Sequence, residues 1–68
     1  MEMSAILTPA LDGGYVAVNP ETGTTTQGDT VEEALANLRE ATMLYLEEFP
    51  MPAAGRPMLT SFHVPEHG

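Results

Sequence analysis

The fold of this chain is decided by residues 13–48, which read GGYVAVNPETGTTTQGDTVEEALANLREATMLYLEE. Tyr15 to Val18 is aromatic and β-branched, so it predicts a strand that follows a Gly-rich turn. Residues 24–27 (TTTQ) are β-branched but polar, which favours either a third strand at a sheet edge or a plain loop. From residue 30 onward the apolar residues recur at helical spacing. The stretch therefore predicts short strands followed by one long helix.

The helix is predicted over residues 30–48. Thr30 and Glu33 fit a capping box, in which each side chain satisfies the other residue's backbone N–H. Asp29 and Glu32 fit the same pattern one position earlier, so the first residue of the helix stays open by one. Proline-rich sequence follows and ends the helix. The apolar residues of the helix form one stripe that we expect to cover the sheet: Val31, Ala34, Leu35, Leu38, Ala41, Tyr45 and Phe49.

The sequence on either side completes the expected fold. Met3 to Thr8 predicts a first strand, joined to the second by an Asp-Gly turn. Residues 50–57 (PMPAAGRP) predict a connection, and residues 58–64 (MLTSFHV) predict a last strand. We therefore expect one α+β domain over residues 1–68, in the order β-β-β-α-β. Its single mixed sheet would have strand order 3-2-1-4, with one long helix packed on one face. The expected core comprises Leu35, Leu38, Tyr45, Phe62, Val16 or Val18, and Ile6 or Leu7.

The charge of the chain is lopsided, with ten Asp and Glu against two basic residues and a net charge of −8. Binding of nucleic acid or of an anionic membrane requires a basic surface, so neither is expected. A basic protein would be attracted. The chain has no Cys, which excludes disulfides and thiolate metal sites. The N-terminal residues lack the pattern of a signal peptide, and we expect a cytoplasmic protein that does not enter membranes.

Several short motifs occur together in an order and spacing typical of one family. They are Gly13-Gly14-Tyr15, Pro20, Gly23, Thr26-Gln27-Gly28-Asp29-Thr30, Glu32-Glu33-Ala34, Asn37 and Glu40-Ala41. With these motifs the chain resembles the toxin-binding domain of HicB-type antitoxins, over nearly its whole length. The resemblance implies a partial ribonuclease-H-like fold, homo-oligomers, and neutralisation of a small basic ribonuclease toxin (HicA-like). The turn at residues 20–24 is shorter than the family's and lacks its Cys, and no C-terminal DNA-binding domain is expected.

We therefore expect a non-catalytic antitoxin-like module of a type II toxin-antitoxin system. The alternative is an orphan structural or regulatory domain that self-associates and has no cognate toxin. The predicted strands carry no Asp or Glu, which argues against a metal-dependent nuclease. His63 and His67 lack an obvious third ligand, and Ser4 and Ser61 lie in no nucleophile motif. No catalytic residue, metal or cofactor is expected.

Two surfaces are candidates for contacts with partners. Glu33, Glu40 and Glu47 are spaced by seven, so they form one outward ridge, with no basic residue three or four positions away. This ridge, together with Met43 and Leu44, is the predicted partner-binding surface, and a merely solvated helix face is the alternative.

The second surface is the sheet face opposite the helix, because one helix covers only one face. Leu59, Ser61 and His63 would lie there if residues 58–64 were a strand. Since so small a core gains stability from association, we expect a homodimer or a higher homo-oligomer, formed through this face or through the unpaired edge of the sheet.

Overall fold

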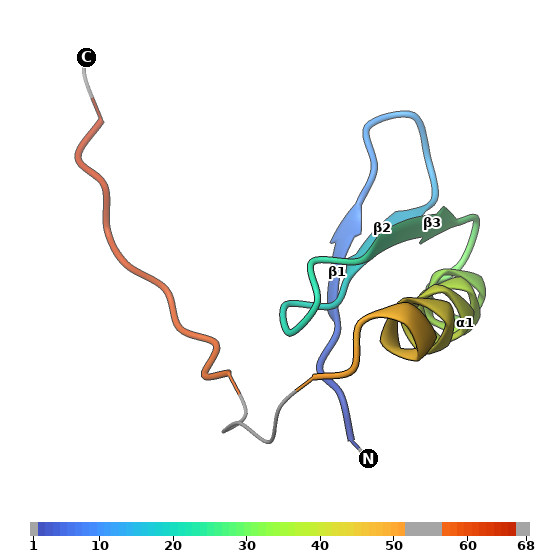
Figure 1. Ribbon diagram of the computed structural model, residues 1–68. Coiled ribbons are helices and arrows are strands. Elements are labelled where there is room, and N and C mark those ends of the chain that lie inside the picture. The colour runs from blue at the N-terminus through green and yellow to red at the C-terminus, as the bar shows by residue number, and fades with distance from the viewer. Residues whose placement is uncertain (1, 52–56, 67–68) are drawn as a thin grey trace.

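The computed structural model describes residues 2–51 and 57–66 of the chain. In these residues three strands form one antiparallel sheet, and one helix follows them (Figure 1). The strands are β1 (Ile6–Pro9), β2 (Tyr15–Val18) and β3 (Thr25–Gly28), and the helix is α1 (Val31–Glu48). The sheet has the order β1-β2-β3, so that β2 lies in the middle and the other two are edge strands.

The predicted sheet of four strands in the order 3-2-1-4 is wrong. The structure has a β-β-β-α order and a purely antiparallel sheet, and residues 58–64 lie outside it. Their apolar side chains are exposed, from 65% at Val64 to 88% at Met58. Alternating apolar and polar residues favour extended backbone, but an unpaired extended segment satisfies that pattern as well as a strand does. Pairing with an edge depends on long-range contacts that the local pattern does not encode.

The helix begins where the capping pattern allows. The Thr30 hydroxyl accepts a hydrogen bond from the backbone N–H of Glu33 at 3.1 Å, so Thr30 and not Asp29 is the N-cap. Glu32 and Glu33 lie in the first turn, where their charges complement the helix dipole. The helix ends at the C-cap Phe49, directly before Pro50.

Two glycines allow the helix and the β1–β2 turn to approach β3 closely. A Cβ atom on Gly28 would lie 2.5 Å from the backbone nitrogen of Ala34 in α1. A Cβ atom on Gly14 would lie 2.6 Å from the carbonyl oxygen of Gly28, and Gly14 also has a positive φ of 76°. Only residues without side chains fit at these two positions.

The core is small and lies between α1 and the central strand. Ala17 and Ala34 are fully buried and Leu38 is 4% exposed, with Leu7 and Tyr15 packed against them. Leu38 and Leu7 were predicted correctly. Ala17 occupies the inner face of β2, so Val16 and Val18 lie on the opposite face and are only partly buried. A small side chain at this point of β2 is what allows the helix to approach.

Other predicted core residues are exposed. Leu35 and Tyr45 are 38% and 37% exposed, and Phe62, which lies outside the helix and the sheet, is 87% exposed. Phe49, expected on the apolar stripe of the helix, is 60% exposed. The helix has 18 residues and spans about 27 Å, whereas strands of four residues span about 13 Å. The helix contacts β3 and β2 but hardly touches β1. Its apolar stripe therefore extends past the surface that the sheet offers.

Candidate functional site

The acidic ridge predicted from the sequence lies on the outer face of α1. Glu33, Glu40 and Glu47 are all exposed, and their spacing places them within about 40° of one another around the helix axis. They lie roughly opposite Leu38, the residue of α1 that faces the sheet. The ridge thus points away from the body of the protein.

Met43 and Leu44 flank the ridge on its two sides. They are 56% and 59% exposed, and successive helical residues lie about 100° apart around the axis. The side of α1 that carries Asn37 faces β3, because the Asn37 amide donates to the backbone carbonyl of Gln27 at 2.9 Å. By helical geometry Leu44 lies on that side, and Met43 lies on the side toward β1. The structure thus places all five predicted partner-binding residues on exposed helix surface.

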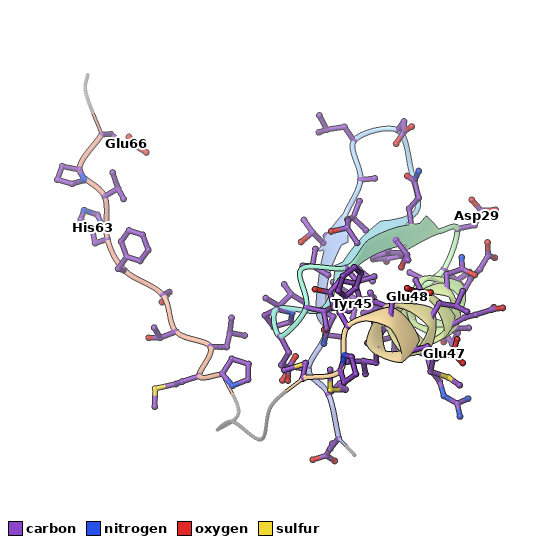
Figure 2. All side chains as sticks on the ribbon, in the orientation of Figure 1. Asp29, Tyr45, Glu47, Glu48, His63 and Glu66 are labelled. Carbon is purple, nitrogen blue, oxygen red and sulfur yellow. The ribbon has the colours of Figure 1, made fainter. Side chains whose placement is uncertain are left out.

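The C-terminal end of α1 carries negative charge that the helix itself does not balance. The last turn contains Glu47 and Glu48 and no basic residue. Figure 2 shows both side chains projecting at the end of the helix. The carbonyl groups at a helix C-terminus already carry partial negative charge, so carboxylates there are unfavourable. A cationic group from outside would be stabilised at this end.

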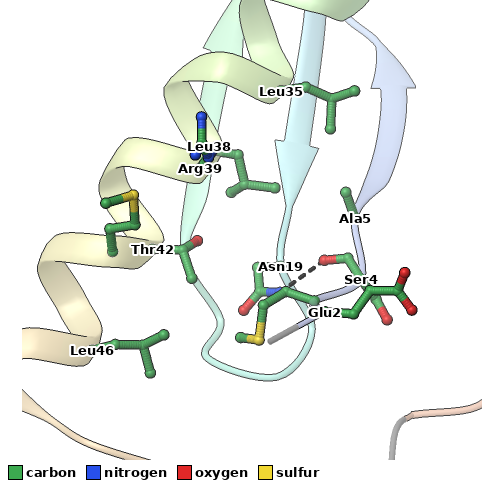
Figure 3. Close-up of a pocket in the computed structure, with 11 residues that line it drawn as sticks. Glu2, Ser4, Ala5, Asn19, Leu35, Leu38, Arg39, Thr42 and Leu46 are labelled. Carbon is green, nitrogen blue, oxygen red and sulfur yellow. Dashed lines mark hydrogen bonds between the residues drawn. The ribbon is translucent and has the colours of Figure 1, made fainter.

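A groove of about 470 Å³ lies beside the ridge, between α1 and the residues that precede β1 (Figure 3). Its apolar wall comes from the helix, and Asn19 lies at its floor. The lining residues are Glu2, Met3, Ser4, Ala5, Asn19, Leu35, Leu38, Arg39, Thr42, Met43 and Leu46. The groove exists because the helix covers β2 and β3 and leaves the side toward β1 open.

Thr42 carries the one buried side-chain oxygen or nitrogen without a hydrogen-bond partner among the described residues. It is only 5% exposed, and its hydroxyl oxygen makes no hydrogen bond in that part of the chain. A buried hydroxyl without a partner lowers stability. Nothing in the sequence distinguishes this threonine from one on an exposed helix face, so its burial was not predicted.

Asn19 holds the floor of the groove together. It is 1% exposed and its amide donates to the Ser4 carbonyl at 2.7 Å and to Glu21 at 2.6 Å. Its carbonyl accepts from the backbone N–H and the hydroxyl of Thr22, at 2.9 and 2.6 Å. An asparagine before Pro20 is a turn signal, but that signal does not indicate that the Asn19 side chain is buried.

Glu21 links the same turn to the N-terminal residues. Both of its carboxylate oxygens accept from the backbone N–H of Ser4, at 3.1 Å. Desolvation alone would raise the pKa of Glu21, but the hydrogen bonds from Ser4 and Asn19 favour the charged form and outweigh it. The pKa of Glu21 is therefore below its ordinary value. This carboxylate is structural, since its oxygens bond groups of its own chain.

A second hollow, of about 450 Å³, lies between the β1–β2 turn and the start of α1. Asp12, Asp29 and Glu33 line it together with the two close-packed glycines. Within residues 2–51 and 57–66, no group of three or more His, Cys, Asp or Glu side chains is arranged to hold a metal ion. The carboxylates here do not form a metal centre in the described structure.

The residues predicted to form the oligomer interface are not on the sheet. Leu59, Ser61 and His63 lie in the extended stretch after the helix, so their predicted place on the open sheet face is wrong. Figure 2 shows His63 and Glu66 far from the sheet and the helix. The contact of these residues with a second copy stays a prediction. His67 lies outside the described residues.

Among residues 2–51 and 57–66, no helix is both long enough and apolar enough to cross a lipid bilayer.

Comparison with known proteins places the chain in a family of small proteins. No family model and no solved structure matches it significantly. The UPF0150 protein ssl0738 of Synechocystis sp. is 48% identical over 48 residues, which cover 69% of this chain and 67% of that protein. The UPF0150 protein ssr1765 of the same organism is 49% identical over 45 residues, which cover 65% of this chain and 57% of that relative. At this identity and coverage, the chain belongs to the UPF0150 family.

Proposed function

We propose that this protein is a non-catalytic, HicB-like antitoxin module that binds and neutralises a small basic ribonuclease toxin of the HicA type. The observation that carries the proposal is the acidic ridge of α1, Glu33, Glu40 and Glu47, flanked by exposed Met43 and Leu44. The complex would form in the cytoplasm, where such a toxin meets its RNA substrates.

The charge distribution supports a cationic partner. The chain carries a net charge of −8, and the ridge continues to the helix C-terminus, where Glu47 and Glu48 oppose the helix dipole. Lysine or arginine side chains of a partner would relieve this unfavourable charge and would speed the encounter. The same charge opposes direct binding of RNA or DNA by this chain.

The apolar side chains beside the ridge support a lasting contact. Charges at an interface rim mainly raise the rate of association, whereas buried apolar side chains slow dissociation. Met43 and Leu44 are more than half exposed and lie on either side of the ridge. A partner that straddles the helix would bury both. This arrangement favours protein binding over a merely solvated acidic face.

The test is binding to a defined toxin. The neighbourhood of the gene is first searched for a small basic open reading frame, and the probe is the product of that reading frame, purified and assayed for RNA cleavage. We expect binding by calorimetry, inhibition of cleavage at equimolar ratio, and affinity that falls with salt. The antitoxin alone should cleave neither RNA nor DNA, with or without Mg²⁺ or Mn²⁺.

A matched pair of variants tests whether the ridge is the binding surface. Glu40→Gln/Glu47→Gln and Asp12→Asn/Glu66→Gln each remove two charges, and all four residues are exposed. Glu33 is left intact because it lies in the first helical turn. The ridge variant should weaken binding about three- to tenfold, and the control much less. Equal weakening by both pairs would contradict the proposed surface, and no binding to the toxin would contradict the function.

The second candidate is a self-associating structural or regulatory domain without a toxin. The observation that favours it is the exposed apolar stretch after the helix, which includes Met58 and Phe62 at 88% and 87% exposure. Absence of any small basic open reading frame beside the gene would favour this candidate.

A further inference from the structure

Two apolar surfaces of this chain are unpartnered and match one another. One is the groove between α1 and residues 2–5, described above. The other is the extended segment, residues 57–66, in which Met58, Leu59 and Phe62 are 79–88% exposed. Figure 1 shows the segment running apart from the sheet and the helix. So much apolar surface in so small a protein marks a contact site.

In the described part of the chain, the groove contains a hydroxyl without a hydrogen-bond partner, and the apolar side chains on its rim are not covered by other residues. The buried hydroxyl of Thr42 lines it and has no partner among the described residues. Backbone N–H and C=O groups of an extended peptide would supply one. Water alone would also satisfy the hydroxyl, but it would leave Leu35 and Met43 exposed on the rim. An extended, largely apolar peptide satisfies both requirements.

Length and charge fit the extended segment to this groove. Ten extended residues span about 33 Å, enough to follow a helix of about 27 Å from end to end. Nine of the ten acidic residues precede Pro50, and the tenth is Glu66, so residues 57–65 carry no negative charge. Arg39, one of only two basic residues, lines the groove. Glu2 also lines the groove, so a segment without acidic residues can enter it without repulsion between like charges.

We propose that the extended segment of a second copy occupies the groove, and that two chains exchange their segments reciprocally to form a two-fold dimer. The chain's own segment runs apart from α1 and from the N-terminal residues (Figure 1). The exchange would bury the side of the segment that carries Met58, Phe62 and Val64 against α1. It would add apolar burial to a core in which only Ala17, Ala34 and Leu38 are buried hydrophobic residues of the described chain. This proposal does not depend on a toxin.

Cysteine cross-linking tests the exchange directly, because the chain contains no Cys. Thr60→Cys is placed in an isotopically labelled copy and Met43→Cys in an unlabelled one, and the two are mixed and oxidised. We expect a mixed disulfide, identified by mass spectrometry. The control replaces Met43→Cys by Leu44→Cys, which is equally exposed but lies on the far side of the ridge. Equal cross-linking at both positions would overturn the proposal.

Sedimentation equilibrium on the wild-type chain and two variants completes the test. Phe62→Ala should weaken dimerisation about tenfold or more, whereas Leu11→Ala, at another fully exposed apolar residue, should not. Both residues are exposed, so neither change should unfold the body. Added salt should strengthen the dimer, because it screens repulsion between two chains of −8 each. A strict monomer would overturn the proposal, as would a monomer in which the Thr60→Cys/Met43→Cys double variant forms an intrachain disulfide.

Discussion

Replacing Gly28 by alanine tests whether close packing of α1 on β3 governs stability. Gly28 does not have a positive φ, so alanine is compatible with its backbone. The added Cβ would lie 2.5 Å from the Ala34 nitrogen, 2.9 Å from the Glu33 carbonyl carbon and 3.0 Å from the Ala34 Cα. All three are backbone atoms, and none can move without moving the helix.

The expected loss follows from this overlap. Nonbonded carbon contacts are optimal near 3.5–4.0 Å, so the first turn of α1 must retreat by roughly 1 Å. Overpacking of this kind costs about 1–3 kcal/mol. Alanine restricts the unfolded chain and offsets about 0.4–1 kcal/mol of that. The net loss is about 1–2 kcal/mol, out of a total of about 3–10 kcal/mol for a domain of this size.

Thermal unfolding followed by the helix signal in circular dichroism measures the effect. For a domain of this length the net loss lowers Tm by about 4–16 °C. The control is Gly23→Asn, since Gly23 has a positive φ of 80° but open space around its Cβ position, and asparagine tolerates that conformation. It should change Tm little. A Gly28→Ala protein that melts within 2 °C of wild type, or a control that loses as much, would refute the packing argument.

Three further predictions concern the groove. Asn19→Ala should cost about 2–4 kcal/mol in urea unfolding, because it removes four hydrogen bonds and leaves buried partners unpaired; a loss below 1 kcal/mol would contradict this. The pKa of Glu21 is lowered in the folded state from its ordinary value of 4.5, so its stabilisation is present above that pH and is lost as pH falls through the lower folded pKa. Glu21→Gln should therefore flatten the acid limb of the Tm-against-pH curve, and an unchanged limb would count against this role. Thr42→Val should raise the free energy of unfolding of the dilute protein by about 1 kcal/mol, and Tm with it, because it removes a buried hydroxyl without a partner. A lower Tm would reveal that the hydroxyl has a partner.

Local signals in the sequence predicted the local elements. The strand over Tyr15–Val18 and the helix with its Thr30 cap have the expected positions, because side-chain shape and capping chemistry act within a few residues. The ridge of Glu33, Glu40 and Glu47 was also predictable, since heptad spacing on a helix fixes relative direction.

Long-range features were not predictable in the same way. The alternation at residues 58–64 indicated extended backbone but not whether an edge strand pairs with it. Which side of β2 faces the helix depends on the approach that Gly28 and Ala17 allow, and not on which residues are most hydrophobic. The groove arises because α1 overhangs the sheet, and no pattern in the sequence indicates that Asn19 and Thr42 are buried.

The order of pairing in the sheet affects how the body of the protein folds. Each strand pairs only with its neighbour in sequence, and α1 follows directly on the strand that it covers most. The connections between paired strands are short, so each pairing closes a small loop at little entropic cost, which favours rapid folding. The body can therefore form from one chain alone. Association with the proposed toxin or with a second copy would then join preformed surfaces instead of folding the body on binding.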